Sequence, residues 1–196
     1  MSTMPKPLLV FEDITTTPRR KLLTLLGVDV AATPYAWLSL PSFCALGILV
    51  ALAQRPEYAA EQTLLVGLGY GLLLYLANIF HSLGHILAGR MLGAPMDILL
   101  LTATRDVTLY LRDQSGHSKW IFIGRSLAGP FSNAVVGAVA LGLRDILGGR
   151  WMLIFAYFNF AIAIWTICPV PSMDGWVIWG ELFHFRRRTS PVTKSS

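Results

Sequence analysis

Hydrophobic and polar positions divide this chain into long apolar stretches separated by shorter charged ones. Four stretches contain no Asp, Glu, Lys or Arg, and they cover residues 30–54, 62–89, 126–143 and 151–173. Each reaches or exceeds the roughly 18 residues that indicate a membrane-spanning helix. Because lipid offers the backbone no hydrogen-bond partners, segments of this kind fold as helices. The pattern therefore predicts four transmembrane helices.

The apolar stretches also indicate where these helices begin and break. The first is expected to begin near Ala36 and the second to cover residues 62–92. The last is interrupted by the Pro-Val-Pro sequence at 169–171 and resumes after Asp174, because proline removes backbone donors. Between the second and third helices, β-branched and apolar runs at 97–112 predict a β-hairpin near the membrane surface.

The N-terminal region lacks such a stretch. Its basic and apolar run within residues 17–27 favours a short helix on the membrane surface, and a solvated tail is the alternative. We therefore expect a cytoplasmic N-terminal segment at 1–35, a transmembrane core at 36–185 and a basic cytoplasmic tail at 186–196. The expected fold class is an all-α membrane protein with four spanning helices and one small β-hairpin.

Composition and charge agree with a membrane location. The chain is 54% hydrophobic and only 14% charged. Thirteen Lys and Arg residues fall on the side that holds both termini, against three on the other side. Basic residues concentrate in cytoplasmic loops, so both termini should be cytoplasmic, in a prokaryotic plasma membrane. The net charge of +5 then reflects orientation and contact with anionic lipid, and no nucleic-acid partner is expected.

The second apolar stretch carries unusual polar residues near its inner end. Asn78, His81, Ser82 and His85 lie about one helical turn apart, so they share one face of the helix or its shoulder. Asp174 is the other unexpected group, because a carboxylate within a span needs a partner or a metal. Counted from the nearest cytoplasmic arginines, the two histidines and Asp174 lie at similar depth. Two imidazoles and a carboxylate are ligands that zinc uses in catalytic sites.

Other interpretations of these residues remain open from the pattern alone. Paired histidines in a membrane helix also serve as packing contacts between helices or as ligands of haem or a pigment. Asp174 could instead cap the half-helix that begins at Gly175, where a carboxylate is favourable. Cys44 and Cys168 both fall within predicted spans, so a disulfide is not expected.

Three sequence segments resemble a known family, the site-2 proteases, which are intramembrane zinc metalloproteases. FHSLGHILAGRMLGAP resembles the family's FHExGHxxxAxxxGxP stretch, KWIFIGRSLAGPFSN resembles its ALAGPxxN stretch, and CPVPSMDG resembles its NLLPxPPLDG stretch. The segments occur in the family's order and on alternate predicted spans. Together the resemblance covers about residues 62–182.

The resemblance implies roles for particular residues. His81, His85 and Asp174 would bind zinc, while Asn133 and Asn159 would lie near the substrate or hold the metal ligands in place. Asn78 on the same helix is a further candidate for that supporting set. The predicted hairpin near 97–112 would correspond to the edge strand on which these proteases hold their substrate by strand addition.

Two positions depart from the family pattern. Ser82 replaces the glutamate that acts as the general base, and a serine hydroxyl does not accept a proton near neutral pH. We expect it instead to bond back to the carbonyl of Asn78. A positioned general base contributes roughly 10²- to 10⁴-fold, so efficient proteolysis is not expected. Thr166 also replaces an asparagine of the family.

The sequence therefore predicts a site-2-protease homologue that retains a zinc site and is catalytically impaired. It would act as a pseudoprotease, binding a transmembrane client or serving as a subunit of a larger membrane complex. The first alternative is an active intramembrane metalloprotease, with another base or with its glutamate altered to trap substrate. The second is a membrane subunit that ligates haem or a pigment.

Overall fold

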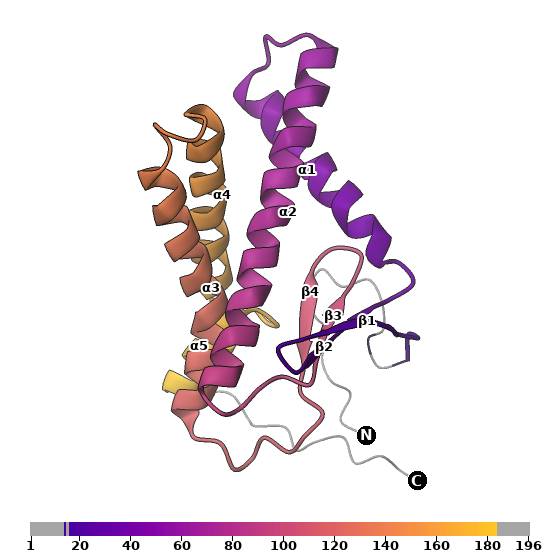
Figure 1. Cartoon of the computed structure of the whole chain (residues 1–196), viewed down its shortest axis with the longest axis vertical. Coiled ribbons are helices and arrows are strands. Elements are labelled where there is room, and N and C mark those ends of the chain that lie inside the picture. Colours follow the sequence, from indigo (N-terminus) through magenta and orange to yellow (C-terminus); the bar gives the residue numbers. More distant parts are fainter. Residues whose placement is uncertain (1–13, 15, 184–196) are drawn as a thin grey trace.

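The computed structural model describes residues 14 and 16–183, and in this part of the chain one small sheet lies beside a group of long helices (Figure 1). The predicted tail at 186–196 and most of the first 15 residues lie outside it. The elements in chain order are β1 (Arg20–Leu25), β2 (Val28–Ala32), η1 (Ala36–Leu38), α1 (Ser39–Gln54), α2 (Ala60–Met91), β3 (Ile98–Leu101), β4 (Asp106–Leu109), α3 (Lys119–Gly142), α4 (Arg150–Ile167) and α5 (Asp174–Phe183).

The predicted hairpin is present and belongs to a larger sheet. β3 and β4 pair antiparallel, and β3 also pairs in parallel with β2, which gives the order β1-β2-β3-β4 over the described residues. The sheet lies beside one end of α2 (Figure 1). Leu100 and Val107 form a small core with Ala31 from β2. The hairpin is therefore anchored by strands from the N-terminal region.

The expectation of a surface helix within residues 17–27 is wrong. This segment forms β1, which turns through Leu26 and Gly27, both with positive φ, into β2. The leucines that suggested an apolar helix face lie in β1 instead, where Leu22 and Leu23 are exposed and β2 supplies backbone partners. Pairing with the later strand β3 decided the outcome, and no local pattern reveals that pairing.

Helices α1 and α2 cross at unusually close range because glycines line their contact. A Cβ atom on Gly47 would collide with the backbone of Gly67 and Gly71. A Cβ on Gly71 would in turn collide with the backbone of Cys44. Small residues of this kind let helices approach within a membrane. Cys44 and Cys168 are both free thiols, as the sequence predicted.

Three helical segments of the described part are long and apolar enough to cross a membrane: Ala36–Gln54, Ala60–Met91 and Arg150–Ile167. The 24-residue helix α3 is not among them, although the sequence predicts a span there. It contains Arg125 and Asn133, both buried, which lower its mean hydropathy. The residues thus form the expected helix, while a fourth span remains a prediction.

The predicted break in the last span is present. Helix α4 ends at Ile167 and α5 begins at Asp174, with the two prolines in the connection. Ser172 adopts a positive φ of 67° there. The indole of Trp179 donates a hydrogen bond to the carbonyl of Ile167 at 2.8 Å, so α5 folds back onto the end of α4. This return places Asp174 opposite α2.

Candidate metal site

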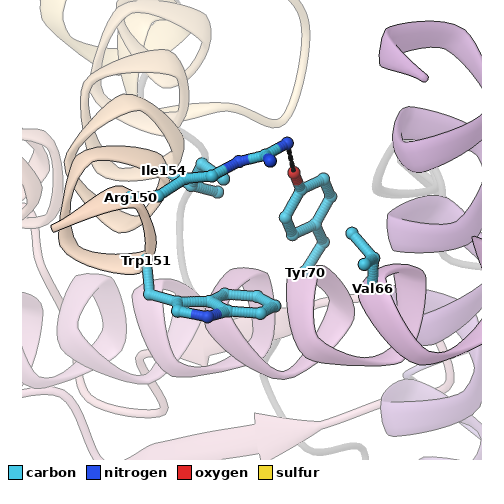
Figure 2. A pocket seen from close by; sticks show the side chains of 5 residues that line it. All are labelled: Val66, Tyr70, Arg150, Trp151 and Ile154. Carbon is cyan, nitrogen blue, oxygen red and sulfur yellow. Dashed lines mark hydrogen bonds between the residues drawn. The ribbon is translucent and has the colours of Figure 1, made fainter. Parts of the chain in front are cut away.

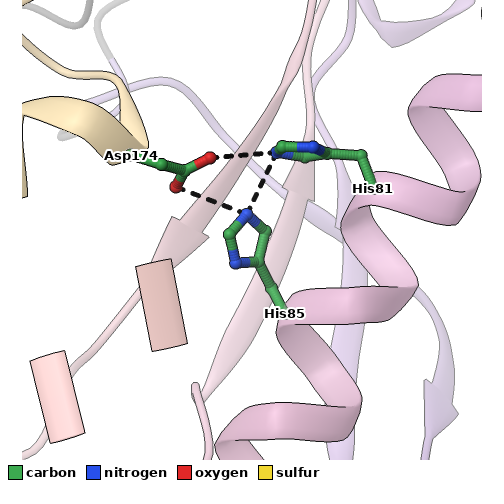
Figure 3. Close-up of side chains that lie close together, drawn as sticks. All are labelled: His81, His85 and Asp174. Atoms are coloured by element: carbon green, nitrogen blue, oxygen red, sulfur yellow. Dashed lines mark hydrogen bonds and ion pairs between the residues drawn. The ribbon is translucent and has the colours of Figure 1, made fainter. Parts of the chain in front are cut away.

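His81 and His85 on α2 and Asp174 at the first turn of α5 point toward one another (Figure 3). The Nε2 atom of His81 lies 3.1 Å from Asp174 Oδ2, and that of His85 lies 3.4 Å from Asp174 Oδ1. The two Nε2 atoms are themselves 3.1 Å apart. Three residues predicted from sequence to share a metal therefore converge on one small space.

These separations fit a tetrahedral metal ion. Ligand atoms placed 2.0–2.1 Å from zinc in a tetrahedron lie about 3.3–3.4 Å from one another. The three observed separations, 3.1, 3.1 and 3.4 Å, are close to the edges of such a tetrahedron. Three protein ligands leave one corner open, which is the composition of catalytic rather than structural zinc sites.

The hydrogen bonds behind the imidazoles prepare both rings for a cation. Nδ1 of His85 donates to the carbonyl of Arg125 at 2.8 Å, and Nδ1 of His81 donates to Asn133 Oδ1 at 2.7 Å. Because each Nδ1 faces an acceptor, it carries the proton, and each Nε2 presents its lone pair. Two lone pairs and a carboxylate then face one another, and a cation relieves their repulsion.

Asn133 and Asn159 form a buried relay behind the site, and both side chains are fully buried. The Asn133 amide donates to the carbonyl of Ala77 and to Asn159 Oδ1, at 2.9 and 2.8 Å. Asn159 donates to the carbonyl of Phe155 on α4. These bonds orient Asn133 Oδ1 toward His81. Thr166, which departs from the family pattern, bonds back to the carbonyl of Ile162 in its own helix.

Gly129 on α3 closes the site at the imidazoles. A Cβ atom there would collide with His85 Nε2 and come within 2.6 Å of His81 Nε2. Any side chain at this position would therefore fill the space in front of both Nε2 atoms. The same closeness of the α3 backbone argues against the haem or pigment alternative, because a flat macrocycle needs open space in front of Nε2.

The structure places Ser82 differently from the sequence expectation. Its hydroxyl does not bond back to the carbonyl of Asn78 and instead donates to Asp106 Oδ2 at 2.6 Å. The Asn78 side chain donates to the same oxygen at 3.0 Å. Both residues therefore donate hydrogen bonds to a carboxylate at the start of β4. A strong charge-assisted bond to that oxygen outcompetes a weak bond within the helix.

Asp106 is the site residue that sequence reasoning missed. The sequence places it in the turn of the predicted hairpin, and its closeness to α2 follows only from the docking of the sheet. Burial raises the pKa of the Asp106 carboxyl, and this rise is opposed by hydrogen bonds from Ser82 and Asn78 and by the charge of His81. A charge pattern could have suggested it, since Asp106 follows Arg105 in an otherwise apolar hairpin.

A second pocket lies at the opposite end of α2 and lacks this chemistry (Figure 2). Val66, Tyr70, Arg150, Trp151 and Ile154 line it. Arg150 donates to the Tyr70 hydroxyl at 3.3 Å, and the Tyr70 and Trp151 rings meet edge to face. This arrangement fixes the end of α4 against α2. The lining contains one basic side chain, that of Arg150, and no carboxylate, so it offers no set of metal ligands.

Comparison with known proteins supports the fold. A scan against family models and a search of curated proteins found no match. Among solved structures, the chain is similar to the site-2 protease from Methanocaldococcus jannaschii, with a TM-score of 0.57 and 15% sequence identity. The match covers 86% of this chain and 73% of the other. The chain therefore has a site-2-protease-like fold, and the three apolar helices among the described residues support a membrane protein.

Proposed function

We propose that this chain is a membrane-embedded zinc protein of the site-2 protease type that engages transmembrane segments of other proteins. The observation that carries the proposal is the convergence of His81, His85 and Asp174 at separations suited to one tetrahedral ion. Their proton-bearing Nδ1 atoms and the space left by Gly129 support it. The resemblance of the three sequence segments names the metal as zinc.

Different residues of the chain would have different roles at this site. His81, His85 and Asp174 would hold the ion, and Asn133 and the Arg125 carbonyl would fix the two rings. When bound, zinc polarises a carbonyl and makes a water more acidic. β4 lies at one edge of the sheet, next to α2 through Asp106, and its outer side would receive an extended client segment by strand addition.

The missing glutamate separates two functions for the same site. In the first, the protein binds its client without efficient cleavage, as a pseudoprotease or as a subunit of a membrane complex. Ser82 favours this function, because its hydroxyl cannot replace a base. In the second, the protein cleaves its client slowly. One observation favours it: the Asp106 carboxylate sits against Ser82.

Metal analysis of the purified full chain tests the zinc site directly. We expect about one zinc per chain, lost in His85→Ala, because that substitution removes one of three protein ligands. His117→Ala is the matched control, since His117 lies in the loop before α3. It should leave the zinc content unchanged.

Two results would count against the proposal. Absence of zinc from the native chain after purification without chelators would mean that the histidines serve helix packing. Equal zinc content in the native chain and His85→Ala would place the ion elsewhere. A visible absorption band that copurifies with the native chain would support the pigment alternative instead.

A further inference from the structure

We propose that Asp106 supplies the general base that helix α2 lacks, so that a carboxylate from the sheet takes the place of one from the helix. The inference rests on the zinc site proposed above and goes beyond it. It assigns a catalytic role to a residue outside the three segments that resemble site-2 proteases. Geometry, fixation of the hairpin and the pattern of hydrogen bonds each support it.

The first support is the position of the carboxylate. In a glutamate, the carboxylate oxygens lie about 2.4 Å from Cγ by standard bond lengths and angles. Serine Oγ and glutamate Cγ are both bonded to Cβ, so the Oγ of Ser82 corresponds in covalent structure to the Cγ of a glutamate. Asp106 Oδ2 lies 2.6 Å from that Oγ. The distance from Ser82 Oγ to the Asp106 oxygen is therefore similar to the distance from Cγ to a carboxylate oxygen within a glutamate.

The second support is the fixation of the hairpin turn that precedes Asp106. Thr102 donates a hydrogen bond to the carbonyl of Arg105 at 2.6 Å and closes the turn. Arg105 Nη2 donates to the carbonyl of Ser172 at 2.9 Å, two residues before the metal ligand Asp174. Ser42 on α1 donates to the carbonyl of Ala103 at 3.3 Å. The turn is thus held to α1 and to the segment that precedes Asp174.

The third support is the way in which Asp106 is bound. The hydroxyl of Ser82 and the amide of Asn78 both donate to Oδ2, and Oδ1 takes part in neither bond. Two donors favour the ionised carboxylate, which is the form that accepts a proton. Oδ1 can then accept that proton while Oδ2 remains anchored. Ser82 and Asn78 thereby acquire a role as positioning residues.

The chemistry requires no further reactant. A water oxygen attacks the carbonyl carbon of the scissile peptide bond and forms the new C–O bond, while one water proton passes to the Asp106 carboxylate. The C–N bond then breaks, and Asp106 returns that proton to the leaving nitrogen. The products are a carboxylic acid and an amine, and Asp106 is restored as a carboxylate. Strand addition along β4 would bring the client backbone beside this residue.

The test compares carboxylate variants of the full chain in detergent. The probe is a single-span peptide of about 20 apolar residues that carries a fluorophore and a quencher at opposite ends. Cleavage, zinc content and melting temperature are measured for every variant. The variants are Asp106→Asn, Ser82→Glu with Asp106→Asn, and the control Asp29→Asn, which alters an exposed carboxylate of the same sheet.

We expect the native chain to cleave the peptide slowly and Asp106→Asn to lose at least about 100-fold in rate, the usual effect of removing a general base. Zinc content and melting temperature should stay at the native values, because the amide oxygen still accepts from Ser82. Asp29→Asn should behave as the native chain. In the double variant the introduced glutamate should restore cleavage, whereas a structural role of Asp106 would leave the double variant inactive.

Several outcomes would overturn the inference. Native-like cleavage by Asp106→Asn would exclude the base role, and so would an inactive double variant that binds zinc. A native chain that binds zinc and leaves the peptide intact, while the double variant cleaves it, would establish a pseudoprotease. A native chain without zinc would overturn the proposed function itself, which the metal analysis records separately.

Discussion

His81 and His85 act as a pair because helical spacing places both rings on one face of α2. Their Nδ1 atoms find different partners, the Asn133 side chain and the Arg125 carbonyl, both from α3. One imidazole therefore depends on a replaceable side chain and the other on backbone. At the scale of single residues, Asn133 is the point at which a substitution can weaken metal binding while leaving every ligand in place.

Asn133→Leu should weaken zinc binding by about 10- to 100-fold, the usual effect of removing a partner that orients a metal-ligating histidine. Competition between the protein and a fluorescent zinc chelator measures this change. Ser132→Ala is the matched control. Ser132 is the neighbouring residue on α3 and donates to the carbonyl of Phe80 rather than to an imidazole. A zinc affinity equal in both variants would mean that His81 needs no support from Asn133.

At the scale of elements, the site depends on how closely α3 approaches α2. Gly84 on α2 packs against the backbone of Ala128, since a Cβ there would collide with the Ala128 carbonyl oxygen at 2.5 Å. Gly129 faces the imidazoles. This close contact allows one α3 helix to provide the Arg125 carbonyl, the Asn133 amide and the closing wall of the site. A wider separation would remove all three.

Gly129→Ala should therefore abolish stoichiometric zinc binding, because its methyl group would occupy the space in front of both Nε2 atoms. Overpacking of this kind also destabilises by about 1–3 kcal/mol, which thermal unfolding in detergent would record. Gly142→Ala at the end of the same helix is the control, since a Cβ placed there meets no atom within 4 Å outside its own stretch of helix backbone. Retention of zinc by Gly129→Ala would show that the helices separate readily.

At the scale of the whole molecule, the described part of the chain consists of long apolar helices and one small sheet. Helix α2 has 32 residues, about 48 Å at 1.5 Å per residue, so it exceeds a hydrocarbon core of about 30 Å. The sheet packs beside one end of this helix (Figure 1). The candidate metal site lies at that end, since His81 and His85 belong to the last turns of α2.

The charge bias predicts that the sheet side is cytoplasmic. In a chain whose native cysteines are replaced, Asp113→Cys and Lys194→Cys should react with an impermeant maleimide only after the membrane is opened. Glu57→Cys, between α1 and α2, should react in intact cells. The labels at 113 and 57 also test whether an odd number of spans separates the two positions, as one spanning α2 requires. Labelling of Asp113→Cys in intact cells would reverse the predicted orientation.

The sequence by itself determined the helices, the break before Asp174 and the three metal-ligand candidates. Apolar length, proline position and helical spacing are local properties, so they can be read along the chain. The hairpin at 97–112 was predictable for the same reason, because its turn interrupts two runs of β-branched and apolar residues.

Only the tertiary structure decided the secondary structure of residues 20–25. They form a strand because β2 pairs with both β1 and β3. It also decided the partner of Ser82. Asp106 is 24 positions away along the chain, and its charge within the hairpin does not reveal which helix it contacts. Docking of the sheet against the helix joins the two residues. Helix α2 has no carboxylate at position 82. Packing of the sheet, rather than spacing along the sequence, brings the Asp106 carboxylate to that position.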